Sequence, residues 1–124
     1  CRLIVDSALI LKKYKNFGQS YALAIVDYTH EALDELDKFI FRDKKYVINK
    51  QLFKLYWCLS ALNNFYDLID DKELREIIDK CSNVKEYTIR EKAAQIVKTS
   101  RLFHDIESKL KSDENYYVRQ IFVD

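Results

Sequence analysis

The fold class of this chain is decided by one stretch, KQLFKLYWCLSALNNFYDLI, at residues 50–69. Its apolar side chains recur at intervals of three and four residues, at Leu52, Leu55, Leu59, Leu62, Tyr66 and Ile69. This spacing places them on one face of an α-helix and excludes the two-residue period of a strand. The opposite side also carries apolar residues, which predicts a helix enclosed by its neighbours: Phe53, Trp57, Ala61 and Leu68.

The composition of the whole chain of 124 residues supports a helical protein. One glycine and no proline leave few of the turn residues that many short strands require. Apolar residues make up 48% and charged residues 33%, as expected for amphipathic helices. We expect an all-α protein, a compact bundle of about five helices that forms one domain over residues 1–124, trimmed at one or both ends.

Charge and cysteine content narrow the classes of partner and compartment. The 21 basic and 20 acidic side chains nearly cancel, so binding to nucleic acid would need a local patch. Cys1, Cys58 and Cys81 are odd in number and far apart, which argues against a disulfide framework or a zinc site. No apolar run reaches the ~18 residues that cross a bilayer, and no secretory signal opens the chain. We expect a cytoplasmic protein with no membrane contact.

The segments before residues 50–69 are predicted to form a helical hairpin. A first helix over residues 1–15 should end near Asn16 to Gly18, because glycine takes the left-handed conformation that ends many helices. A second helix is expected over residues 19–42, with an apolar stripe on one side and carboxylates on the other. A short basic link then leads to residues 50–69.

The segments after residues 50–69 are also predicted to be helical. Asp70 or Asp71 is the expected N-cap of a shorter helix that ends near residues 81–83. Thr88 and Glu91 have the spacing of a capping box, and we expect the helix that they begin to continue to about Lys111. Residues 112–115 should break it, and residues 116–123 form a last helix or an extended tail.

Histidine is a common metal ligand, and the chain contains two histidines, His30 and His104. His30 lies between Asp27 and Asp34 at helical spacing, and we interpret it as a solvated histidine between carboxylates. A two-metal bundle site would need a second helix with a matching motif, which is missing. His104-Asp105 is similar to the paired residues of HD phosphohydrolases, but the other ligands lack counterparts. The sequence also contains no glycine-rich phosphate-binding loop and no nucleophile elbow. We therefore expect no metal and no cofactor.

Arg101 and His104 are the candidate catalytic residues. They stand three residues apart on the helix expected over residues 88–111, so both can project from one face, with Arg90 on the same side. Such an arginine can hold an RNA phosphate while the imidazole moves a proton from the 2′-hydroxyl, which metal-free RNA cleavage requires. The alternative is a solvated face on which Arg101 pairs with Asp105. The nine tyrosines and seven phenylalanines are expected in the core rather than in a base-stacking platform.

A HEAT-type array of helices is the competing architecture. Similar short segments begin at Tyr46, Tyr87 and Tyr116, and IREKAAQIV at residues 89–97 resembles the start of a HEAT-type helix. The segments are separated by 41 and then 29 residues, and the expected helices are long for that class, which favours a globular bundle. The array implies a non-enzymatic module that binds another protein.

Three segments together resemble the AbiV-type abortive infection proteins of the HEPN superfamily. LIVDSALILKKYKNFGQSYALAI at residues 3–25 is similar to that family's opening hairpin. FHDIESKL at residues 103–110 is similar to its histidine-lysine segment, and RQIFVD at residues 119–124 is similar to its arginine followed by an aromatic-Val-Asp ending. The order along the chain agrees with that family.

The resemblance implies a HEPN-like bundle of an antiviral or toxin type that acts on RNA or on the translation machinery, commonly as a homodimer. Arg101 and His104 then become the candidate catalytic pair of a metal-independent ribonuclease, and Arg90 and Arg119 the candidate binding residues. The chain departs from the pattern, because HEPN ribonucleases carry an arginine separated from histidine by four to six residues, whereas two residues separate Arg101 from His104.

Overall fold

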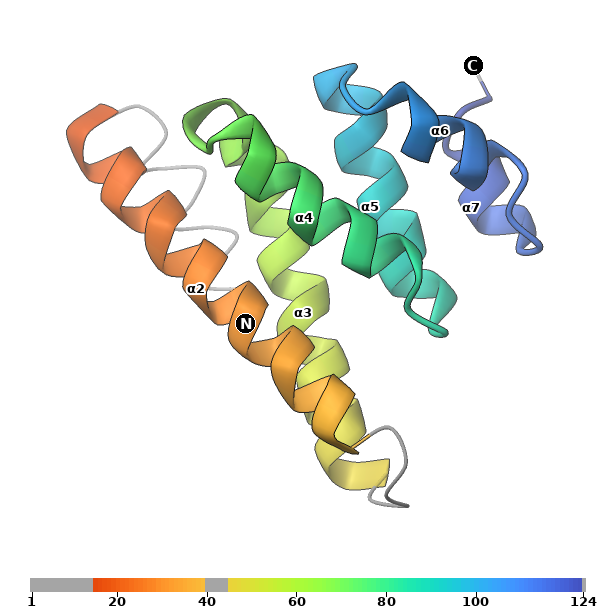
Figure 1. Cartoon of the computed structure of the whole chain (residues 1–124), viewed down its shortest axis with the longest axis horizontal. Helices are drawn as coiled ribbons and strands as arrows, with labels where there is room; N and C mark the ends of the chain where they lie inside the picture. Colours follow the sequence, from red (N-terminus) through yellow and green to blue (C-terminus); the bar gives the residue numbers. More distant parts are fainter. Residues whose placement is uncertain (1–14, 40–44, 124) are drawn as a thin grey trace. The chain divides into compact units, whose positions relative to one another are not determined.

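The computed structural model describes residues 15–39 and 45–123, and these residues are helical throughout, apart from short loops (Figure 1). The helix expected over residues 1–15 lies, except for its last residue, outside the described residues. Within them, no strand is present, which confirms the all-α class. The elements are α2 (Lys15–Phe39), α3 (Lys45–Phe65), the 3-10 turn η1 (Tyr66–Leu68), α4 (Asp71–Ser82), α5 (Tyr87–Ser100), α6 (His104–Lys111) and α7 (Tyr116–Gln120).

The chain divides into two compact units, Cys1–Ile69 and Asp70–Asp124. The first unit contains α2, α3 and η1, and the second contains α4 to α7. Each unit has buried apolar side chains of its own. The single domain expected from the length of the chain stays a prediction.

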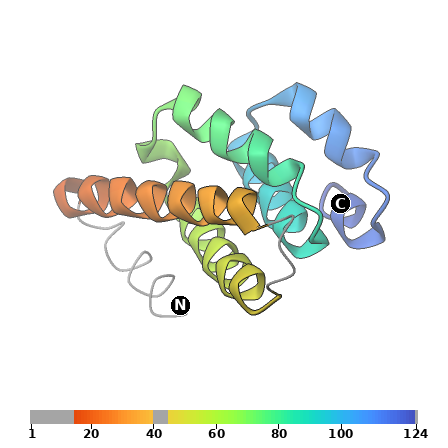
Figure 2. The same ribbon diagram turned by 60° about the horizontal axis from the view of Figure 1, so that its bottom comes forward.

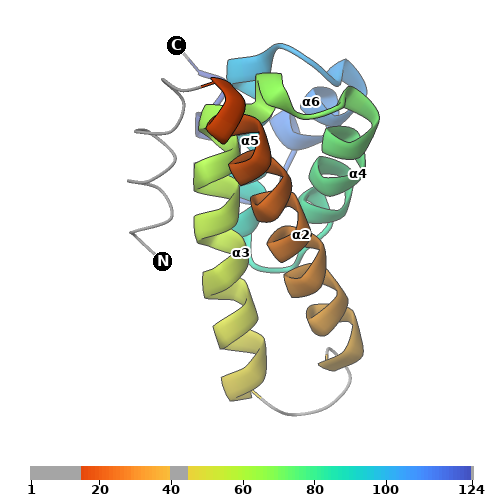
Figure 3. The same ribbon diagram turned by 90° about the vertical axis from the view of Figure 1, so that its left-hand side faces the viewer.

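In the first unit, α2 and α3 pack against each other in opposite directions (Figures 1 and 3). The predicted apolar face of α3 is confirmed, because Leu55, Leu59 and Leu62 are fully buried. The opposite side is less enclosed than expected, since Phe53 is 66% exposed. No helix in residues 15–39 or 45–123 combines the length and the apolar character that a membrane span requires.

The helix end predicted near Gly18 is wrong. The helix α2 begins at Lys15 and passes through Gly18 to Phe39. Glycine in a helix interior costs about 1 kcal/mol relative to alanine, but it keeps its backbone N–H and so does not interrupt the hydrogen bonds as proline would. Residues 40–44, where the expected second helix was to end, lie outside the described residues.

The second unit consists of shorter helices joined by tight loops, coloured green to blue in Figure 2. The helix predicted after Asp70 is confirmed as α4, with Asp70 at its N-cap position. Both α4 and α7 pack on α5, and α6 contacts α4, α5 and α7. The core of the unit is formed by fully or nearly fully buried side chains from all four helices, including Leu74, Ile77, Ile78, Ile89, Ile96, Ile106, Leu110 and Val118.

The single helix predicted over residues 88–111 is wrong, because the chain turns a corner after Ser100. The backbone of Arg101 and that of Phe103 both adopt the left-handed conformation, with φ of 60°. The N–H of Arg101 donates to the carbonyl of Val97 over 3.0 Å, which ends α5, and α6 begins at His104. A non-glycine residue pays about 1–2 kcal/mol for this conformation, so sequence rules alone do not place a corner here.

The start of α5 also differs from the prediction. The extended backbone of Glu86 occupies the N-cap position, and Thr88 lies inside the helix, so the capping box predicted at Thr88 and Glu91 is wrong. The Thr88 hydroxyl instead donates to the Glu86 carboxylate over 3.3 Å. At the other end of the unit, residues 112–115 do break the helix. Of the two options for residues 116–123, the helix is observed, as the short α7.

Candidate functional site

The corner between α5 and α6 sets the geometry of the candidate catalytic pair. Arg101 follows the last residue of α5, and His104 is the first residue of α6. The two residues therefore do not lie on one face of a single helix, which differs from the prediction. Both residues are exposed, and the His104 side chain is 83% exposed. The Arg101 guanidinium makes no hydrogen bond or ion pair within residues 15–39 and 45–123. A phosphate can therefore reach both groups from solvent.

The His104 ring is held by a carboxylate on its own helix. Its Nδ1 lies 3.2 Å from Oε2 of Glu107, one turn along α6. The other oxygen of Glu107 lies 3.1 Å from Nζ of Lys111. The hydrogen bonds from Lys111 and from His104 lower the pKa of Glu107. This arrangement fixes Nδ1 toward the carboxylate, and within the described residues Nε2 has no partner and is the nitrogen that can exchange a proton with a ligand.

The corner is tied to α4 by Arg75. Its guanidinium forms a bidentate ion pair with Asp105, in which Nη1 donates to Oδ1 over 3.0 Å and Nη2 donates to Oδ2. The same guanidinium lies over the Phe103 ring, with Cζ 5.8 Å from its centre. The alternative interpretation, in which Arg101 pairs with Asp105, is wrong because Arg75 occupies that carboxylate. The hydrogen bond from Arg75 lowers the pKa of Asp105 to about 2.

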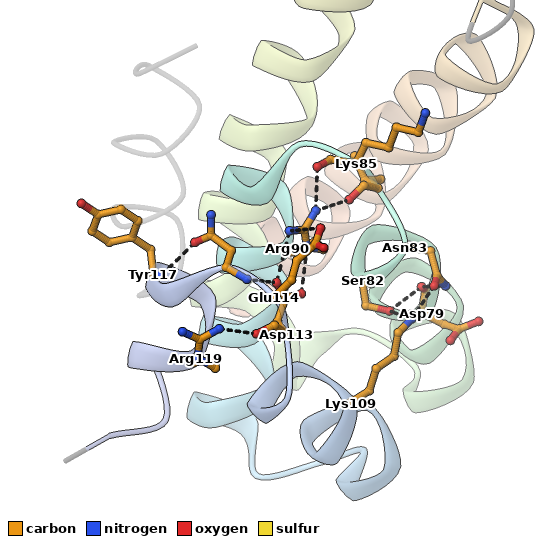
Figure 4. A network of polar contacts seen from close by, with 12 residues as sticks. Asp79, Ser82, Asn83, Lys85, Arg90, Lys109, Asp113, Glu114, Tyr117 and Arg119 are labelled. Carbon is orange, nitrogen blue, oxygen red and sulfur yellow. Dashed lines mark hydrogen bonds and ion pairs between the residues drawn. The ribbon is translucent and has the colours of Figure 1, made fainter.

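Arg90, a predicted binding residue, is buried inside the second unit (Figure 4). Its Nη1 donates to the carbonyls of Val84 and Lys85 over 2.9 Å and 2.6 Å. Its Nε and Nη2 donate to the two carboxylate oxygens of Asp113 over 2.8 Å and 3.2 Å. The guanidinium is thus engaged on all three nitrogens. The structure places it among the loops that it connects, rather than on the surface where a bound phosphate would need it.

Arg119, the other predicted binding residue, is exposed on α7. Its Nη1 donates to the backbone carbonyl of Asp113 over 2.6 Å (Figure 4). Asp113 also accepts the backbone N–H of Asn115 over 2.9 Å. Burial raises the pKa of Asp113, but the hydrogen bonds from Arg90 and Asn115 outweigh it and lower the pKa below its ordinary value. One ionised carboxylate therefore joins Arg90 to the start of α7.

Metal ligation has no geometric support in the part of the chain that the structure describes. No group of three or more histidine, cysteine or carboxylate side chains there is placed to hold an ion. His30 lies half-buried on α2, between the exposed Asp27 and Asp34.

A surface cluster of three tyrosines was missed by the sequence reasoning, which expected aromatic residues in the core. The rings of Tyr87 and Tyr117 stack with centroids 5.9 Å apart and an interplanar angle of 26°. Tyr116 meets Tyr117 edge to face at 5.6 Å. Tyr116 and Tyr117 are each 58% exposed. The signal was the Tyr-Tyr pair itself, because adjacent residues on a short helix cannot both face the core.

Comparison of the chain with protein-family models, with curated proteins and with solved structures finds no match.

Proposed function

We propose that this chain is a HEPN-like helical domain of an antiviral, abortive-infection type that acts on RNA in the cytoplasm, with Arg101 and His104 as its catalytic pair. The observation that carries the proposal is the exposure of both groups at one corner. The Arg101 guanidinium is unengaged within the described residues, and the His104 ring is oriented through Nδ1 by Glu107. The resemblance to AbiV-type proteins supplies the substrate class.

The chemistry needs only groups that the corner presents. Arg101 would bind the scissile phosphate, since guanidinium forms paired hydrogen bonds with phosphate oxygens. Nε2 of His104 would take the proton from the 2′-hydroxyl as that oxygen attacks phosphorus. The bond to the 5′-oxygen then breaks, and the proton returns from the imidazolium to the leaving oxygen. The products would be a 2′,3′-cyclic phosphate and a 5′-hydroxyl, with no change of oxidation state.

The test is cleavage of labelled single-stranded and hairpin RNA by the purified chain in the presence of a metal chelator. We expect cyclic phosphate products from the wild type and their loss in His104→Ala and in Arg101→Ala. Lys72→Ala removes an exposed cation from α4 and should cleave like the wild type. If the wild type leaves both RNAs intact, and His104→Ala arrests growth of an expressing host as the wild type does, the ribonuclease proposal fails.

The homodimer implied by the resemblance belongs to the same proposal. A dimer would place two such corners in one assembly. Sedimentation velocity over a range of protein concentrations measures the oligomeric state. A monomer at every concentration would contradict the dimer.

A non-enzymatic module that binds another protein is the second candidate function. It is favoured by large apolar side chains that remain exposed on the first unit, where Phe53 is 66% and Leu23 is 56% exposed. A module of this kind predicts that Phe53→Asp or Leu23→Asp abolishes the biological effect while His104→Ala leaves it intact. The opposite pattern would support the ribonuclease.

A further inference from the structure

The start of α7 carries an aromatic surface that the proposed catalytic pair does not use. The stacked rings of Tyr87 and Tyr117, with Tyr116 set against Tyr117 edge to face, form one cluster. Although Tyr116 and Tyr117 make these ring contacts, more than half of each side chain remains open to solvent. Tyrosines that contact each other and stay exposed present flat apolar rings without forming a core.

A network of polar contacts holds this surface in place before any ligand binds. The Asn115 side chain accepts the backbone N–H of Tyr117 over 2.8 Å, and Asp113 accepts the N–H of Asn115. Asp113 is itself fixed by the buried Arg90. Figure 4 shows the Tyr117 side chain pointing away from this network. The turn that carries the tyrosines is thus held by hydrogen bonds before a ligand binds. Little conformational entropy of this turn is therefore lost on binding.

The charges around the tyrosines include a cation that a ligand can use. Arg119 is exposed three residues after Tyr116, and only its Nη1 is occupied within the described residues. The side chain of Glu114 is 92% exposed, and its carboxylate lies 4.0 Å from Nη2 of Arg90. The positive charge of Arg90 partly neutralises this carboxylate. The half-buried Glu86 carboxylate accepts the Thr88 hydroxyl. The exposed neighbours Glu114, Arg119 and Gln120 are polar, which favours a ligand that carries polar or charged groups of its own.

We infer that Tyr116 and Tyr117, flanked by Arg119, form a stacking surface for unpaired nucleotides of RNA. Bases stack on exposed aromatic rings with a strength that depends little on sequence, and an arginine beside them binds the backbone phosphate. That the nucleic acid is RNA rests on the proposed function, whereas the stacking surface itself does not. The surface would hold single-stranded RNA on the same unit as Arg101 and His104, and thereby select unpaired over paired substrates.

The test is fluorescence anisotropy with a labelled 2′-O-methyl RNA decamer, which cannot be cleaved by attack of its 2′-oxygen. We expect the wild type to bind this strand more tightly than an abasic strand of equal charge and more tightly than the duplex. Loss of stacking weakens binding by about 5-fold to 150-fold per base. We therefore expect at least about ten-fold weaker binding by Tyr116→Ala/Tyr117→Ala. Arg119→Gln should lower the dependence of log K on log salt by about one.

Two variants keep the test independent of folding. Tyr116→Phe/Tyr117→Phe retains both rings and should bind like the wild type. Tyr28→Ala removes an exposed aromatic ring from α2 of the first unit and should also leave binding unchanged. The inference is overturned if the abasic strand or the duplex binds as tightly as the single strand, or if the double alanine variant binds like Tyr28→Ala. It is also overturned if the wild type binds no RNA.

Binding of the 2′-O-methyl RNA decamer and cleavage of unmodified RNA together distinguish this inference from the proposed function. If the decamer is bound through the tyrosines but unmodified RNA is not cleaved, the catalytic proposal fails and the stacking surface stands. If RNA is cleaved and the tyrosine variants neither bind nor cleave differently from the wild type, only the stacking surface fails.

Discussion

Arg90 and Asp113 form a bidentate ion pair whose side chains are only 9% and 10% exposed. The pair connects α5 to the loop between α6 and α7, 23 residues later in the chain. Arg90 also donates to two carbonyls of the loop before α5. One guanidinium therefore joins two loops of the second unit that do not follow each other in sequence.

Removal of one partner of this pair should destabilise the second unit. In Asp113→Ala the Arg90 charge stays buried without its carboxylate, and loss of one partner of a buried pair costs about 3–5 kcal/mol. Urea unfolding followed by circular dichroism measures the change in the free energy of unfolding. The control is Glu76→Gln, which breaks the exposed pair with Lys80 and should cost less than about 1 kcal/mol. Equal effects of the two variants would contradict a structural role for Arg90.

The Asp105 carboxyl should titrate far below an ordinary aspartate. The hydrogen bond from Arg75 lowers its pKa from 3.8 to about 2, and Arg75→Gln should return the pKa toward 3.8. Carbon-detected NMR titration of the side-chain carboxyl measures both values. A wild-type pKa that stays near 3.8 would show that the ion pair does not form in solution.

Stability should fall in acid because of the same carboxylates. The pKa values of Asp105 and Asp113 are lowered in the folded chain, so the unfolded chain binds more protons between about pH 4 and the folded pKa values. Their contribution is complete above about pH 4 and is lost as the pH falls toward 2. Thermal melting at a series of pH values measures this, and in Arg75→Gln the acid-induced loss between pH 4 and 2 should be smaller. An unchanged slope in that variant would contradict the prediction.

The left-handed backbone of Arg101 gives a prediction that separates stability from activity. Arg101→Gly should raise the free energy of unfolding by about 1 kcal/mol, because glycine takes φ of 60° without the steric cost. The same variant removes the guanidinium and should abolish cleavage. Lys98→Gly, within the last turn of α5, should instead destabilise by about 1 kcal/mol. Destabilisation by Arg101→Gly would mean that the corner is not left-handed in solution.

The buried face of α3 should control the stability of the first unit. Leu59 is fully buried, and Leu59→Ala should cost about 2–5 kcal/mol through lost burial and the cavity that it leaves. Phe53→Ala, on the exposed side of the same helix, should change stability by no more than about 0.5 kcal/mol. Hydrogen exchange of α2 and α3 amides measures both effects. Comparable losses in the two variants would contradict the assignment of faces.

Local patterns were enough to predict the helical class and the buried face of α3. Apolar spacing and the lack of glycine and proline act within a few residues, so a sequence displays them directly. The corner at Arg101 was not predictable, because no glycine or proline marks it and contacts from Arg75, about 30 residues earlier, accompany it. Burial of Arg90 likewise depends on Asp113, which lies 23 residues later in the chain. The structural role of Arg90 therefore could not be predicted from local sequence.

Each unit contains a fully buried cysteine whose reaction with a reagent can report the opening of that unit. Cys58 lies in the first unit and Cys81 in the second. Burial raises the pKa of the Cys58 thiol, and only the thiolate reacts readily with alkylating reagents. Modification must therefore wait until the surrounding helices open. Pulsed alkylation followed by peptide mass spectrometry can therefore measure the opening of each unit separately, through its own cysteine and without any mutation.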